Sequence, residues 1–273
     1  PRAAFLLEML ALLSASIGDD PAALDYGTRA VGIQETIGQG TVALASALDA
    51  LGRAHMRRGA FTEALACFTR RLRIVESAKP DSEAVATTLH QAGLCCLLQP
   101  DGARGGIPYL ERTVALRRRL HPDAPQTALA LAALGWALES AGQEEEARPA
   151  LEEALKLIER VAPDSADHAT VLLMLVQRAG AGESLQQTQR ALEIVQRQTR
   201  GDSLLMGTLH VEVGWCMVRN GDLPGARRHF EQGLSLAERS ALGTFCSAWA
   251  REGLGTVAVA AGRTDEAIGH YQA

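Results

Sequence analysis

A fixed spacing of small and large residues recurs along the chain and constrains its fold more than any other feature. In the stretch LGWALESAGQEEEARPALEEAL, Gly135 is followed seven residues later by Gly142, five later by Ala147, and four later by Leu151. The same spacing starts at three other glycines and ends at an aromatic residue: Gly52 to Phe68, Gly214 to Phe230, and Gly255 to Tyr271. Because a period of about 41 residues is typical of repeat arrays, the sequence predicts stacked units rather than one central core.

Each copy has the pattern of two amphipathic helices joined by a turn. The second glycine of each copy falls where a helix ends and where left-handed backbone favours glycine: Gly59, Gly142, Gly221 and Gly262. The first glycine and the alanine lack bulk where two helices approach, and the large residue fills the remaining space. Abundant Ala, Leu, Glu and Arg, with only 4% aromatic residues, favour helix throughout. The sequence predicts an all-α fold.

Three similar junctions, SAKPDSE, RLHPDAP and RVAPDSA, separate the units. Pro80, Pro122 and Pro163 each end a helix, and we expect the Asp or Ser that follows to cap the next helix. We therefore predict a single array of six to seven helix-pair units, with approximate bounds 1–38, 39–80, 81–122, 123–163, 164–202, 203–240 and 241–273, the last of them truncated.

Three of these units depart from the pattern. The first has Ala11 in place of the first glycine. The third keeps its first glycine, Gly93, but departs from the pattern at QPDGARGG, where Pro100 falls in the turn. The fifth lacks about one turn of its first helix, so we expect a local shift in curvature around residues 177–185. The chain starts at Pro1 and stops inside a helix, and we expect it to be a segment of a longer protein.

These features resemble the tetratricopeptide repeat, in which Leu-Gly, a helix-ending glycine and an alanine are followed by a large residue. The longer period resembles the kinesin-light-chain subclass, and similar arrays occur in bacterial signalling proteins. The resemblance covers essentially the whole chain. It implies an α-solenoid of antiparallel helix pairs, wound as a right-handed superhelix, whose concave surface is lined by the first helix of each unit and binds a protein or peptide.

The resemblance also indicates which residues face a partner. With the first glycine of a unit counted as position 8, positions 2, 5, 9, 12 and 13 share one face of the first helix. On that face we predict twelve partner-binding residues: Asp49, Arg53, Met56, Arg57, His90, Leu94, Trp136, Glu139, Trp215, Arg219, Trp249 and Glu252.

Two interpretations stay open for these side chains. Trp136, Trp215 and Trp249 either anchor a partner or pack against neighbouring helices. Arg53 and Arg57 either clamp an acidic peptide or terminal carboxylate, or Arg53 is held by Asp49 four residues earlier. Related arrays hold a peptide backbone with asparagine, whereas the only asparagine here lies in a turn, so a helical or bulky apolar partner fits better.

Several classes of function are not predicted. The net charge of -5 disfavours a nucleic-acid surface, and the run Arg117 to Arg119 is interpreted as a solvated face. No apolar run reaches the roughly 18 residues that span a bilayer, and FLLEMLALL near the start is interpreted as a buried helix rather than a signal peptide. Five cysteines without metal-binding or disulfide spacing fit a reduced, cytoplasmic compartment.

No catalytic motif was found, and no cofactor or metal is predicted. The seven histidines are scattered among units, and the GxGxxA matches at 38–43 and 253–258 lack the preceding strand that a dinucleotide site needs. The sequence therefore predicts a non-enzymatic scaffold that binds a protein or peptide. The alternative is a regulatory or sensor arm of a larger signalling protein, which binds its own protease, kinase or ATPase effector domain or a small signalling peptide.

Overall fold

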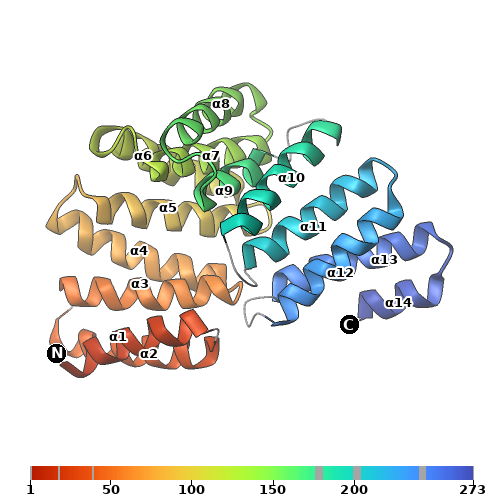
Figure 1. Ribbon diagram of the computed structural model, residues 1–273. Coiled ribbons are helices and arrows are strands. Elements are labelled where there is room, and N and C mark those ends of the chain that lie inside the picture. Colours follow the sequence, from red (N-terminus) through yellow and green to blue (C-terminus); the bar gives the residue numbers. More distant parts are fainter. Residues whose placement is uncertain are drawn as a thin grey trace. The chain divides into compact units, whose positions relative to one another are not determined.

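The computed structural model describes residues 2–17, 19–38, 40–175, 181–198, 204–239 and 244–272, and these ranges contain helices and turns but no strand. The helices, labelled in Figure 1, are α1 (Arg2–Ile17), α2 (Asp20–Ile37), α3 (Val42–Arg57), α4 (Phe61–Ala78), α5 (Glu83–Leu97), α6 (Ala103–Leu120), α7 (Pro125–Ser140), α8 (Glu144–Val161), α9 (Ala166–Leu175), α10 (Ala181–Gln198), α11 (Leu204–Arg219), α12 (Leu223–Arg239), α13 (Thr244–Ala260) and α14 (Thr264–Gln272). The predicted all-α solenoid of antiparallel helix pairs is confirmed.

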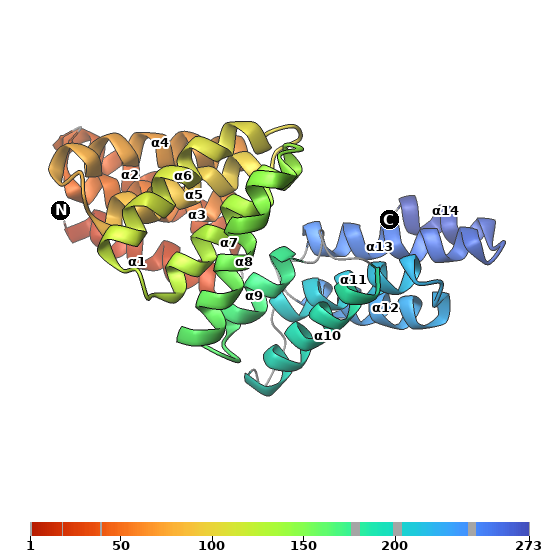
Figure 2. The same cartoon turned by 90° about the horizontal axis from the view of Figure 1, so that it is seen from above.

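The chain divides into two compact units, Pro1–Ala154 and Leu155–Ala273, with the boundary inside α8. In the first unit each helix from α1 to α7 packs against the next, and α1 also contacts α3. Figure 2 shows α2, α4 and α6 along one side of this unit and α1 and α7 along the other. In the second unit α11 packs against both α12 and α13, so the same alternation of odd and even helices continues.

The predicted contacts between small and large residues form at each complete copy of the spacing. A Cβ atom added to Gly52 would lie 2.8 Å from the ring of Phe68, and one added to Gly214 would lie 2.6 Å from Phe230. Equivalent close approaches join two further pairs, Gly135 to Leu151 and Gly255 to Tyr271. Phe68, Leu151 and Phe230 are fully buried. In these four pairs glycine is needed at position 8, because a side chain there would overlap the large residue of its own helix pair.

The predicted turn glycines are also confirmed. Gly59, Gly142, Gly221 and Gly262 have φ values of +73°, +79°, +81° and +72°, in the left-handed region that side chains with a Cβ atom rarely adopt. The amide of Gly142 donates to the carbonyl of Glu139, and the amide of Gln143 donates to that of Leu138. The left-handed glycine thus lets the chain reverse, and the amides of the turn donate to free carbonyl groups at the end of the odd-numbered helix.

Helix capping by the junction residues is confirmed at two junctions and wrong at the third. The Ser82 hydroxyl accepts from the amide of Val85, and the Ser165 hydroxyl accepts from the amide of His168. Before α7 the cap position is Ala124, which has no side-chain acceptor. Proline at the first position of α7 removes one of the amides that a cap would satisfy, which lowers the need for one.

The third helix pair makes the same contact between small and large residues, but with residues one position later in its second helix than the spacing predicts. A Cβ atom on Gly93 would lie 2.6 Å from Leu110, and one on Gly106 would lie 2.8 Å from the carbonyl oxygen of Gly93. Gly106 and Leu110 therefore replace the expected small and large residues, one position later than the spacing predicts. The turn absorbs the extra residue, and Asp101 takes a left-handed conformation with φ of +55°.

Two predictions about local exposure are wrong. The segment FLLEMLALL forms most of α1, but Phe5, Leu6 and Leu13 are 61%, 60% and 57% exposed, because α2 and α3 cover only one side of this helix. The arginine run is not a solvated face throughout. Arg117 is buried, with its Nη2 3.1 Å from a carboxylate oxygen of Glu83, whereas Arg118 and Arg119 are exposed.

Of residues 177–185, where a shift in curvature was predicted, 177–180 lie outside the described residues and 181–185 belong to α10, so the prediction is not tested. Within the described ranges, no helix combines the length and apolar character that crossing a bilayer requires.

We expect Gly214→Ala to lower the free energy of unfolding by about 1–3 kcal/mol, because the new methyl group would overlap the buried ring of Phe230. Gly32→Ala is the matched control, since a Cβ atom there meets nothing within 4 Å and alanine favours helix by about 0.5–1 kcal/mol. Urea denaturation of both variants checks the prediction. Equal stabilities of the two variants would show that position 8 does not require glycine.

Candidate functional site

The predicted partner-binding residues lie on odd-numbered helices of both compact units. We call the eight in the first unit the first odd-helix face: Asp49, Arg53, Met56, Arg57, His90, Leu94, Trp136 and Glu139 on α3, α5 and α7. The four in the second unit form the second odd-helix face: Trp215, Arg219, Trp249 and Glu252 on α11 and α13. All twelve side chains are exposed or half-buried.

Two arginines share one carboxylate on the first odd-helix face. Asp49 Oδ1 lies 3.0 Å from Nη1 of Arg71 on α4, and Asp49 Oδ2 lies 3.8 Å from Nη1 of Arg53. The pairing of Asp49 with Arg53 thus forms, but the shorter contact is to Arg71, which the sequence analysis missed. Arg71 is largely buried and also donates to Gln91, whereas the Arg53 side chain is 54% exposed. One carboxylate thus faces two guanidinium groups, which leaves one positive charge in excess at the exposed Arg53.

Arg57 has a different partner. Its Nε donates to Oδ1 of Asp20 on α2 at 2.9 Å, and both groups are mostly buried. This ion pair joins the first two helix pairs. The structure therefore gives Arg57 a role in packing and leaves Arg53 as the accessible arginine of α3.

His90 and Leu94 bring a neutral and an apolar side chain to the middle of this face. Burial, reinforced by the positive charge of Arg117, lowers the pKa of His90 to about 4, so the imidazole is neutral at pH 7. Its Nδ1 atom is buried and has no hydrogen-bond partner within the described residues. Met56 is half-buried against the cluster around Phe68, and Glu139 is half-buried on α7.

The tryptophans at position 9 have different surroundings. Trp215 packs edge-on against Phe230, with ring centroids 5.3 Å apart and an angle of 70° between the planes. Trp249 packs against the same core cluster. Trp136 makes no aromatic ring contact within the described residues, because the fourth helix pair has Leu151 where the sixth has Phe230. The packing interpretation therefore suits Trp215 better than Trp136.

The remaining two residues complete the second odd-helix face. Arg219 Nη2 donates to the Sγ atom of Cys216 at 3.0 Å, which holds its guanidinium along α11. Glu252 is exposed on α13, where its backbone carbonyl accepts from the hydroxyl of Thr256.

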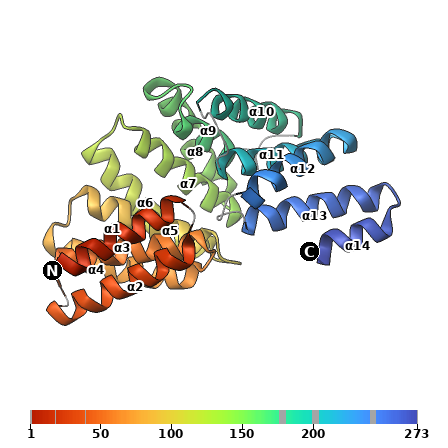
Figure 3. The ribbon, with the colours of Figure 1, turned by 60° about the horizontal axis from the view of Figure 1, so that its bottom comes forward.

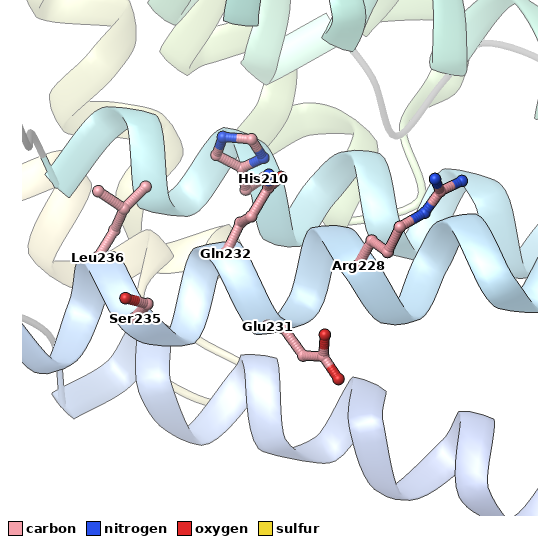
Figure 4. A pocket seen from close by; sticks show the side chains of 6 residues that line it. All are labelled: His210, Arg228, Glu231, Gln232, Ser235 and Leu236. Carbon is pink, nitrogen blue, oxygen red and sulfur yellow. The ribbon is translucent and has the colours of Figure 1, made fainter.

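Two hollows of the described chain are lined by other residues than these twelve. One of about 470 Å³ is lined by His210 of α11 and by residues of α12, and Figure 4 shows His210 and Gln232 pointing toward each other while Arg228 points away. Another, of about 330 Å³, lies between α6 and the turn after α7. Neither of these two hollows is lined by any of the twelve predicted residues.

A histidine pair beside the larger hollow was also missed by the sequence analysis. The Nδ1 atoms of His210 and His229 lie 3.1 Å apart, which requires one neutral ring to donate and the other to accept. Burial, reinforced by His229, lowers the pKa of His210 to about 4. Burial and Arg228 lower the pKa of His229. Within the described part of the chain, no three His, Cys, Asp or Glu side chains are placed to hold a metal ion.

Comparison with known proteins identifies the repeat. Two family models, both described as Tetratricopeptide repeat, match residues 47–81 and 105–160. A search of curated proteins gives no match. The apo form of RapI is similar in fold at a TM-score of 0.72, with 12% identity over 87% of this chain and 84% of that chain.

Two further solved structures share the fold. The Rap conjugation gene regulator of the plasmid pLS20, solved in complex with the Phr* peptide, has a TM-score of 0.65 and 13% identity over 90% of this chain and 65% of that chain. A tetratricopeptide repeat protein from Parabacteroides merdae has a TM-score of 0.56 and 14% identity over 100% of this chain and 92% of that chain. At these identities the likeness concerns the fold.

The lowered pKa of His210 predicts that acid destabilises the second compact unit. The pKa of this ring is 6.5 when unperturbed and about 4 in the folded chain, so between these values the unfolded chain binds a proton that the folded chain excludes. The free energy of unfolding therefore falls as pH falls through this window, by about 1 kcal/mol near pH 5.5 for this ring. Urea denaturation of wild type and His210→Gln at pH 7.5 and 5.5 checks this, and an identical pH dependence in the two proteins contradicts it.

Proposed function

Because the chain is an array of tetratricopeptide repeats, we propose that it is a protein- or peptide-binding module whose partner lies along the first odd-helix face. The observation that carries the proposal is the accessible set of charged, apolar and aromatic side chains on α3, α5 and α7. Proteins of this fold are generally scaffolds without catalytic activity, and we infer binding rather than catalysis.

The charge on α3 supports a partner with an acidic group. Asp49 cannot neutralise Arg53 and Arg71 together, and Arg53 is the more accessible of the two. A carboxylate from an acidic side chain or from a chain terminus would restore the balance, and it would pair with the planar guanidinium through two parallel hydrogen bonds. The partner thereby replaces a contact that Asp49 makes only at 3.8 Å.

The other end of the face supports an apolar contact. Leu94 is half-buried on α5, Leu98 is 38% exposed at the end of the same helix, and Trp136 lies on α7. Large aromatic side chains that stay accessible on a binding surface often contribute most of the affinity. A partner with a bulky apolar residue and an acidic group, presented on a helix or a short peptide, matches both ends of the face.

A second candidate function is a regulatory or sensor arm that binds a small signalling peptide or an effector domain of the same protein. The fold of this chain is similar to that of RapI and of a Rap conjugation gene regulator that binds a peptide, which supports this candidate. Both candidates use the same face. They differ in whether binding controls an effector domain of the same protein, and the full reading frame would show whether such a domain is attached.

We expect Arg53→Glu to weaken partner binding at least tenfold. Peptides selected by phage display on the whole chain serve as probes, and their affinity is measured by fluorescence anisotropy. Reversing the charge of Arg53 places two carboxylates beside Arg71 and repels an acidic partner. Arg73→Glu on α4 changes an exposed arginine in the same way and is the matched control. An equal loss in both variants would place the acidic contact elsewhere or show that only net charge matters.

Trp136→Ala should mainly weaken binding and Trp215→Ala should mainly lower stability, although the two residues share one repeat position. Trp136→Ala should weaken binding of the selected peptides by a factor of ten or more and leave urea stability within about 1 kcal/mol of wild type. Trp215→Ala should lower stability by about 2–3 kcal/mol, because it removes the ring that packs on Phe230. Loss of stability in Trp136→Ala, with binding unchanged, would contradict the assignment of Trp136 as an anchor.

A further inference from the structure

Two histidine side chains meet between the helices of one pair in the second compact unit. His210 lies on α11 and His229 lies on α12, and these two helices pack side by side (Figure 3). The Nδ1 atoms of the two rings lie 3.1 Å apart, and the ring centroids lie 5.2 Å apart. The two rings therefore present the same nitrogen atom to each other.

This approach can be used in two ways. With the proton of one ring on Nδ1, that ring donates a hydrogen bond to the other. A neutral imidazole can also carry its proton on Nε2, which leaves the lone pair of Nδ1 free. With both rings in that form, two lone pairs face each other, and a cation between them would be bound by both.

The distance between the two Nδ1 atoms matches that between two nitrogen ligands of one metal ion. Zn²⁺ binds histidine nitrogen at about 2.0–2.1 Å with tetrahedral angles, which places two such ligands about 3.3 Å apart. The right angles of a square-planar Cu²⁺ site place them about 2.9 Å apart. The observed 3.1 Å lies between these values, so a small rotation of the rings is enough for either ion.

Both rings are uncharged at neutral pH, which a metal site requires of its histidines. Burial, reinforced by His229, lowers the pKa of His210 to about 4. Burial and Arg228 lower the pKa of His229, whereas Asp222 acts in the opposite direction. Arg228 points away from His210 in Figure 4, so its charge is directed away from that ring.

Space and a further oxygen ligand lie beside His210. The hollow of about 470 Å³ that this ring lines has room for an ion with bound water molecules. Gln232 points toward His210 (Figure 4), and a side-chain amide oxygen is a neutral metal ligand. No third His, Cys, Asp or Glu joins the pair within the described ranges. The protein thus supplies two nitrogen ligands, and Gln232 and water complete the coordination.

We propose that His210 and His229 form a two-histidine site for an exchangeable divalent ion from the zinc and copper end of the first-row transition metals. Imidazole ligands select these ions over Mg²⁺ and Ca²⁺, which prefer oxygen. Structural zinc sites have four protein ligands, so an ion held by two exchanges more readily. The bound ion joins α11 to α12 and stabilises the folded chain. None of the twelve predicted partner-binding residues takes part, so this site is independent of the proposed function.

Isothermal titration of the whole chain, without an affinity tag, with ZnCl₂ at pH 7.5 tests the site. We expect one ion per chain. His210→Gln and His229→Gln should each weaken binding at least tenfold, because each variant leaves a single imidazole. His121→Gln changes an exposed histidine of the first compact unit and is the matched control, which should bind Zn²⁺ as wild type does. MgCl₂ should give no saturable binding to wild type.

Two measurements on the wild type do not depend on how the substitutions affect folding. One equivalent of Cu²⁺ should give an electron paramagnetic resonance spectrum with splitting from two imidazole nitrogens. Zn²⁺ should also raise the urea concentration at which the chain unfolds, because the unfolded chain does not hold the two rings together. Circular dichroism without metal checks that each variant is folded.

Three results would overturn the proposal. Failure of the wild type to bind Zn²⁺ and Cu²⁺ saturably excludes the site. Binding that persists in both His210→Gln and His229→Gln indicates an adventitious ion only, held elsewhere on the chain. Loss in one variant alone, with splitting from a single nitrogen in the wild-type copper spectrum, shows that one histidine binds the ion without the other.

Discussion

The contact between a glycine and a large side chain, made where two helices of a pair cross, sets the geometry on which the rest of the structure depends. Phe230 shows how far its influence reaches. The ring fits against Gly214 of α11, and a Cβ atom on Gly253 of α13 would lie 2.4 Å from the same ring. One side chain thus fixes both the spacing within a helix pair and the approach of the next odd-numbered helix. Because Gly214 and Gly253 have no side chain, three helices can meet at this one ring.

The sequence predicted this framework because its determinants are local. A left-handed glycine, the small residue five positions later and the large residue after it all lie within one helix pair, so their spacing can be read directly. Even the third pair, with its extra turn residue at Asp101, recovers the contact through Gly106 and Leu110. What the sequence could not show depends on contacts between distant helices. Three contacts depend on which side chains meet across helices. They are the ion pair of the buried Arg117 with Glu83, the ion pair of Arg71 with Asp49, and the contact between His210 and His229.

The candidate site shows the same division between position and environment. Helical periodicity selected twelve side chains that are exposed or half-buried, because one face of a helix repeats with its turn. It could not separate Trp136 from Trp215, which share a repeat position, since the difference lies in the partner helix: leucine in one pair and phenylalanine in the other. It also could not show that Asp49 serves two arginines, because Arg71 belongs to another helix. The binding chemistry of a repeat therefore depends on the even-numbered helices as much as on the odd ones.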